Sequence, residues 1–126
     1  MKKVLLLSMP FGALERQALG LSLLKATLTE LDIECDVRYL TFTFAEFIGY
    51  EEYQWMLFEA PYTAFAGDWT FIHSLYGENR EATKHYIEEV LCQTWRLDGA
   101  AVERILRIRA LTPHFLEYCL VTIPWA

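Results

Sequence analysis

The sequence predicts an α/β fold in which an N-terminal strand–helix–strand unit is followed by a mostly helical part. A continuous apolar run near the N-terminus predicts a strand, and leucines at helical spacing follow it. An alternating segment then predicts a second strand, after which the strand pattern stops. With 126 residues, the chain suits a single domain, 1–126, comprising a βαβ unit at 1–41 and an aromatic-rich helical part at 42–126.

The first strand extends from Lys3 to Ser8. Its uninterrupted apolar pattern is typical of a central parallel strand that is buried on both faces. Pro10 and Gly12 end it. The helix that follows covers residues 19–31, and its apolar side chains predict a broad stripe that packs on a sheet. These side chains are Leu21, Leu24, Leu28 and Leu31, widened by Leu19, Leu23 and Ala26.

The second strand, 33–40, alternates apolar and charged residues, which predicts one covered face and a position near a sheet edge. Together the two strands and the helix form a right-handed, Rossmann-like βαβ unit. Two strands leave the parallel sheet incomplete, since such sheets usually have more strands and both faces covered. Either the chain is the front part of something larger, or another chain covers the open part.

The remaining residues are predicted to be mainly helical. One helix is expected at 45–58, a less regular segment at 61–77, and a helix from Arg80 to about Trp95 with Asn79 as its N-cap. Asp98 caps a long final helix, in which Thr112-Pro113 either introduces a kink or starts a new helix. One face of this helix is apolar, with Ala101, Ile105, Ile108 and Phe115.

Composition excludes several classes of protein. The net charge of −6, with 11 basic residues and no basic patch, argues against a nucleic-acid partner. No apolar run approaches the roughly 20 residues that span a bilayer, and the short N-terminal run before Pro10 is not a signal peptide. Cys35, Cys92 and Cys119 are widely spaced and odd in number, so we expect a reduced, cytoplasmic protein rather than a disulfide scaffold.

The candidate chemical groups do not form a catalytic or metal-binding set. His73, His85 and His114 are not at metal-ligand spacing from one another or from a cysteine, so no metal site and no catalytic residue is predicted. Asp68 is expected to cap the following turn, although its aromatic surroundings could instead raise its pKa. The adjacent pairs Glu51-Glu52 and Glu88-Glu89 diverge on a helix and are interpreted as solvated.

The segment 42–76 holds 12 of the chain's 19 aromatic residues. Aromatic side chains at helical spacing most often form core. Two other interpretations remain open: a contact surface for another subunit or a peptide, and stacking on a flat cofactor.

Three segments resemble the start of radical S-adenosylmethionine (SAM) enzymes that mature ribosomally made peptides (RiPPs), which begin with a cobalamin-binding, Rossmann-like domain. They are residues 4–40, with SMPFG at 8–12 and LGLSLLK at 19–25; AGDWTFIHSLYG at 66–77; and FLEYCL at 115–120. The family's Cys-x3-Cys-x2-Cys run, which holds an iron–sulfur cluster, is absent, as is the barrel that binds S-adenosylmethionine.

The resemblance implies a cobalamin-contacting role for the turn after the first strand and for the helix start. The positions that it carries over are Ser8, Met9, Pro10, Phe11, Leu19 and Gly20. Without the resemblance, the same turn could be a plain connection, and no GxGxxG run supports a dinucleotide site.

Two functions therefore stay open. The first is a non-catalytic cobalamin-binding-domain-like fragment, or standalone relative, of peptide-maturing radical SAM enzymes, without an iron–sulfur cluster of its own. The alternative is a protein-interaction module that forms homo-oligomers or docks on a larger modification enzyme. In either case the expected partners are a second copy or a larger enzyme subunit, with a precursor peptide as a further candidate.

Overall fold

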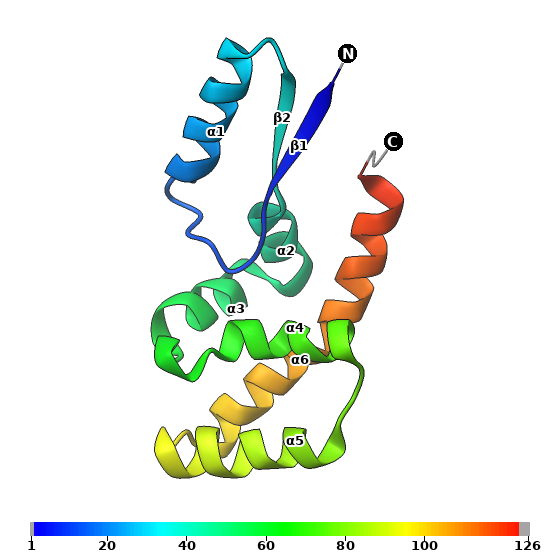
Figure 1. Cartoon of the computed structure of the whole chain (residues 1–126). Helices are drawn as coiled ribbons and strands as arrows, with labels where there is room; N and C mark the ends of the chain where they lie inside the picture. The colour runs from blue at the N-terminus through cyan, green and yellow to red at the C-terminus, as the bar shows by residue number, and fades with distance from the viewer. Residues whose placement is uncertain (1, 124–126) are drawn as a thin grey trace.

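The computed structural model describes residues 2–123 and has a mixed α/β architecture that is 69% helical (Figure 1). A two-stranded sheet and one helix form the N-terminal end; the remaining helices pack below it, except that the last turns of α6 rise beside the sheet. The regular elements are β1 Lys3–Ser8, α1 Leu19–Glu30, β2 Glu34–Tyr39, α2 Leu40–Ile48, α3 Tyr50–Gln54, α4 Ala66–Tyr76, α5 Arg80–His85 and α6 Gly99–Thr122. Short π- and 3₁₀-helical turns complete the chain at η1 Trp55–Glu59, η2 Tyr62–Ala64 and η3 Tyr86–Thr94.

The predicted strand–helix–strand order is confirmed. β1 and β2 are parallel, and their register runs from Lys3 opposite Glu34 to Ser8 opposite Tyr39. The prediction that β1 is buried on both faces is wrong, because its residues from Val4 onward are only half-buried. Within residues 2–123, β2 is the single strand that pairs with β1. The alternation predicted for β2 is confirmed, since Cys35 is buried between exposed neighbours.

Helix α1 covers the sheet less completely than its leucine stripe predicts. Leu21 and Leu28 are half-buried, whereas Leu24 and Leu31 at the margin of the same stripe are 52% and 65% exposed. No residue of α1 is fully buried. A two-stranded sheet is too narrow to cover a stripe of this width, which is why the predicted packing is only partly achieved.

Helix α2 begins at Leu40, immediately after β2, rather than at Ala45 as predicted. The apolar residues that seemed to end the strand form the first turn of the helix instead, and Leu40, Phe44 and Ile48 share its buried side. Spacing of four residues places these side chains one above another on a helix. Direct passage from strand to helix brings α2 against the carboxyl end of the sheet (Figure 1).

The prediction of a less regular segment at 61–77 is wrong over most of that length, because residues 66–76 form helix α4. Pro61 and the glycines at 67 and 77 suggested a loop. Gly77 does end the helix, with a φ of 83°, but Gly67 lies within its first turn. There its missing side chain allows the ring of Phe11 to lie against the helix backbone.

The core lies where α2, α3, α4 and α6 meet. The rings of Phe44 and Phe115 are 4.7 Å apart, and those of Phe11 and Tyr53 are 5.1 Å apart. Leu91 of η3 and Ile105 of α6 are also fully buried. The interpretation of the aromatic segment as core is therefore confirmed for Phe44 and Tyr53. Several other aromatic residues of the segment are exposed: Phe42, Phe47, Tyr50, Phe58, Tyr62, Phe65 and Tyr76.

The helix caps predicted at Asn79 and Asp98 are confirmed. The Asn79 Oδ1 atom accepts a hydrogen bond from the backbone N–H of Ala82 at 3.0 Å, and the Asp98 Oδ1 atom accepts one from Ala101 at 2.8 Å. Helix α6 continues through Pro113 to Thr122, so no new helix starts there. Its direction changes along its length in Figure 1, as expected where proline removes a backbone donor. In the described part of the chain, no helix has the length and apolar character to cross a bilayer.

Candidate functional site

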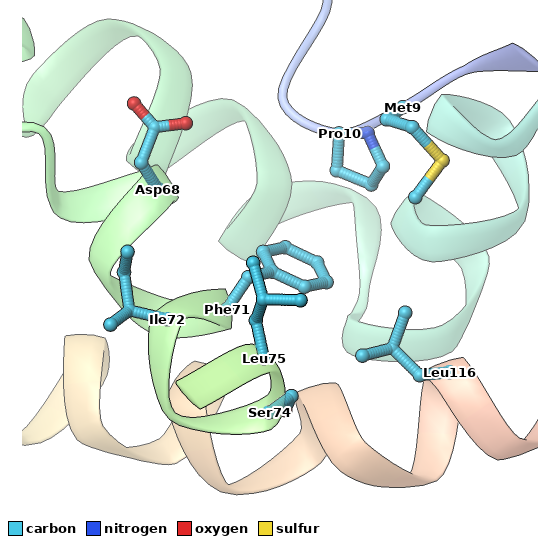
Figure 2. Close-up of a pocket in the computed structure, with 8 residues that line it drawn as sticks. All are labelled: Met9, Pro10, Asp68, Phe71, Ile72, Ser74, Leu75 and Leu116. Carbon is cyan, nitrogen blue, oxygen red and sulfur yellow. The ribbon is translucent and has the colours of Figure 1, made fainter. Parts of the chain in front are cut away.

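A cleft of about 390 Å³ opens beside the carboxyl end of β1. Its walls come from three separate parts of the chain: the turn after β1, helix α4, and Leu116 of helix α6 (Figure 2). Met9 and Pro10 line it from the turn, and Phe71, Ile72 and Leu75 line it from α4. In open α/β sheets, ligands bind outside the carboxyl ends of the strands, so this cleft is the candidate functional site.

The chemistry of the cleft is mainly apolar. Besides the side chains named above, it contains Ser74 and Asp68. The Asp68 carboxylate lies at one end and points away from the apolar side chains (Figure 2). Asp68 is in the first turn of α4, and the residue at the N-cap position is Phe65, so the prediction that Asp68 caps the turn is wrong. An apolar wall with one acidic group at its end suits a largely hydrocarbon ligand that carries a hydrogen-bond donor.

Contacts to the core fix the turn that forms one wall of the cleft. The Tyr53 hydroxyl donates a hydrogen bond of 2.5 Å to the backbone oxygen of Gly12. Phe11 points into the core, where its ring meets those of Phe44 and Phe71 at 5.4 and 6.3 Å. The turn is therefore anchored at two adjacent residues, while Met9 and Pro10 are left facing the cleft.

The structure separates the six predicted ligand-contacting residues into different surroundings. Met9 and Pro10 line the cleft, whereas Phe11 is part of the aromatic core. Ser8 is the last residue of β1 and is half-buried. Leu19 and Gly20 begin α1 and do not line the cleft; Leu19 is 71% exposed, and a Cβ added to Gly20 would meet no atom within 4 Å. A cobalamin-contacting role for these residues stays a prediction.

The cleft also contains residues that sequence reasoning did not select, namely Phe71, Ile72, Leu75 and Leu116. They belong to a segment predicted to be irregular and to a helix predicted to pack against the core. Spacing of three and four residues at positions 68, 71, 72 and 75 is a helical signal that could have identified one lining face.

Near the cleft, an aromatic stack carries a perturbed tyrosine. The rings of Trp69 and Tyr86 are stacked at 4.4 Å, and the Arg109 guanidinium lies 4.8 Å from the Trp69 ring centre. Burial, followed by the nearby Asp68 charge, raises the pKa of Tyr86 to about 12. The Tyr86 hydroxyl donates a 2.7 Å hydrogen bond to the backbone oxygen of Ala64. This tyrosine therefore stays protonated and structural rather than acting as an acid or base near neutral pH.

The histidines and cysteines are not gathered at the cleft. His85 pairs with Glu89 at 3.3 Å on an exposed helix face, and His114 is exposed on α6. Burial, and then the Arg109 charge, lower the pKa of His73, whose buried Nδ1 atom has no hydrogen-bond partner. Among residues 2–123, no group of three His, Cys, Asp or Glu side chains is placed to hold a metal ion. Cys35, Cys92 and Cys119 are free thiols in the described part of the chain.

Comparisons with models of known protein families, with characterised proteins and with solved structures find no match to this chain.

Proposed function

We propose that the chain is a non-catalytic cobalamin-binding-domain-like fragment, or standalone relative, of peptide-maturing radical SAM enzymes, and that the apolar cleft beside β1 is its ligand site. One observation carries the proposal. The three segments that resemble this family are distant in the sequence, yet each contributes to the wall of the same cleft. The first supplies Met9 and Pro10, the Gly-Asp-Trp segment supplies residues of α4, and the late segment supplies Leu116.

The residues of the cleft fit contact with part of a large flat ring. Their apolar side chains suit the hydrocarbon periphery of a corrin, and Asp68 and Ser74 could accept hydrogen bonds from its amide groups. At about 390 Å³, the cleft lies within the range of small-molecule sites and would enclose only a portion of cobalamin. None of the three histidines lines it. The cobalt ion would supply any chemistry, while Met9, Phe71 and Leu75 would hold and orient the ring.

The proposal is tested with hydroxocobalamin, whose visible absorption changes when the surroundings of its cobalt ion or ring change. Titration at tens of micromolar, with calorimetry in parallel, should give a saturable isotherm. Leu75→Glu places a charge on the cleft wall and should weaken binding by at least about tenfold. Leu75 is 75% exposed, so the substitution has little effect on folding.

Leu23→Glu is the matched control, because Leu23 is 60% exposed on α1 and does not line the cleft. It should bind hydroxocobalamin as the parent does. Absence of both a spectral change and heat with the parent would exclude direct binding. Equal weakening by the two glutamate variants would show that the ligand binds somewhere other than the cleft.

A second function, that of an interaction module, is favoured by the exposed apolar side chains outside the cleft. Leu24 and Leu31 of α1, and Leu120 and Val121 of α6, are each more than half exposed. Large exposed apolar side chains are typical of surfaces that contact protein. Sedimentation at several concentrations tests for association between copies; a monomer at every concentration would exclude homo-oligomers.

A further inference from the structure

The two strands of the sheet differ in what they present at their outer edges. β2 alternates Glu34, Asp36 and Arg38 with apolar residues, which is the charged pattern that protects a natural edge strand. β1 is uncharged from Val4 to Ser8, with apolar side chains toward both faces, which is the pattern of a central strand. In the described structure β1 nevertheless has a strand neighbour on one side only.

The outer backbone of β1 has no partner from other parts of the described chain. Hydrogen bonds outside the helices and the sheet ladder involve turns, caps and side chains, and none reaches residues 3–8. The strand has no proline, no bulge and no charged side chain between Val4 and Ser8 to prevent pairing. An edge with these properties is a template for another strand.

Helices on either side of the sheet keep some of their apolar side chains exposed. Helix α1 packs on one side, with Leu24 and Leu31 left largely exposed. The last turns of α6 lie on the other side, where Tyr118 and Ile123 share a hollow with residues of β2, and Leu120 and Val121 are exposed (Figure 1). Because α1 and this hollow adjoin β2 more than β1, only the residues and the open backbone of β1 itself favour a third strand.

We propose that the open edge of β1 is a docking site for an uncharged, apolar β-strand of a partner protein, which pairs with β1 in parallel orientation. The continuous apolar pattern of β1 argues for parallel neighbours, because parallel strands are covered on both faces. A second copy related by a twofold axis perpendicular to the strands would present its own β1 antiparallel, since such an axis reverses the strand direction. Main-chain hydrogen bonds would give affinity, and the apolar faces would select the sequence.

The test uses a synthetic peptide of about five alternating valine and isoleucine residues between two lysines, labelled with fluorescein. We expect saturable one-to-one binding with a dissociation constant below about 1 mM. Amide hydrogen exchange should slow for the outward-facing N–H groups of β1 and stay unchanged in β2. A nitroxide on the amino end of the peptide should broaden NMR signals near Lys3, and one on the carboxyl end should broaden signals near Ser8.

The matched control peptide carries proline at its central position and should not bind, because proline cannot donate to a ladder. No binding by the parent peptide, protection at β2, or reversed nitroxide effects would each overturn the proposal. Slow exchange of β1 in the chain without peptide, together with dimers in sedimentation, would identify a second copy as the occupant instead.

Two proline variants of the chain localise the contact. Leu5 and Leu6 are neighbours in β1, so the N–H of one faces β2 and that of the other faces the open edge. Both substitutions remove a half-buried leucine, so both variants lose some stability. The variant with the higher melting temperature carries proline toward the open edge, and it should lose peptide binding. Hydroxocobalamin binding is independent of this edge, and Leu75→Glu should leave peptide affinity unchanged. Failure of the proposed cobalamin site and failure of the proposed strand-docking edge can therefore be told apart.

Discussion

Replacement of Gly67 by alanine tests how the turn after β1 is attached to α4. Gly67 is the second residue of α4, and the ring of Phe11 lies directly against its backbone. An alanine Cβ would lie 2.7 Å from the Phe11 Cδ2 atom, about 0.7 Å short of the 3.4 Å at which ordinary contact begins. The ring is held by Phe44, Tyr53 and Phe71, so it has little room to withdraw.

Two effects of opposite sign determine the result. Alanine favours a helix over glycine by up to about 1 kcal/mol, which would stabilise α4. Overpacking against a fixed ring costs about 1–3 kcal/mol. We therefore expect a net loss of free energy of unfolding of about 1 kcal/mol. Gly20→Ala is the matched control, because Gly20 is also the second residue of its helix and its added Cβ would meet no atom within 4 Å.

Urea unfolding followed by circular dichroism measures both variants. Subtracting the Gly20→Ala result removes the helix preference and leaves the clash, so the two variants should differ by about 1–3 kcal/mol. Phe11→Leu should remove much of the penalty of Gly67→Ala, giving a coupling energy of about 1 kcal/mol in a double-mutant cycle. Equal stabilisation by Gly67→Ala and Gly20→Ala would refute the packing of Phe11 against α4.

Three other predictions concern α6 and its neighbours. Thr112→Val should cost about 1 kcal/mol, because the buried hydroxyl donates to the Thr70 oxygen at 2.8 Å, whereas exposed Thr122→Val should cost less than half as much in the same urea assay. Asp98→Ala should remove the α6 cap and lower stability by about 1 kcal/mol, and Asp98→Asn should retain most of it. The pKa of His73 in the folded chain lies below its ordinary value of 6.5. Its contribution to the free energy of unfolding is therefore present above pH 6.5 and is lost as the pH falls, because the unfolded chain takes up a proton first. The His73→Gln variant should lose less stability between pH 8 and pH 5.5 than the parent.

Sequence patterns predicted the features that depend only on residues close together in the chain. The alternation of β2 and the caps at Asn79 and Asp98 depend on neighbours within a few residues, so sequence alone identified them. Periodicity alone predicted a less regular segment at 61–77, where residues 66–76 form helix α4. Its glycine is required by a ring that arrives from residue 11, and a contact across 56 positions leaves no local signal. Only part of the cleft was predicted, for the same reason. The turn after β1 was identified as a candidate site, whereas the wall that α4 contributes to the cleft was not.

The mismatch at β1 has a different origin, because its local pattern and its observed position disagree. The apolar pattern of a central strand predicts a neighbouring strand on each side, and the described chain has a strand on one side only. Natural edge strands carry charges or prolines that prevent unwanted pairing, and β2 has charges of this kind while β1 from Val4 to Ser8 has neither. The strand pattern and the open backbone edge therefore have one common physical explanation, the partner strand that we propose for β1.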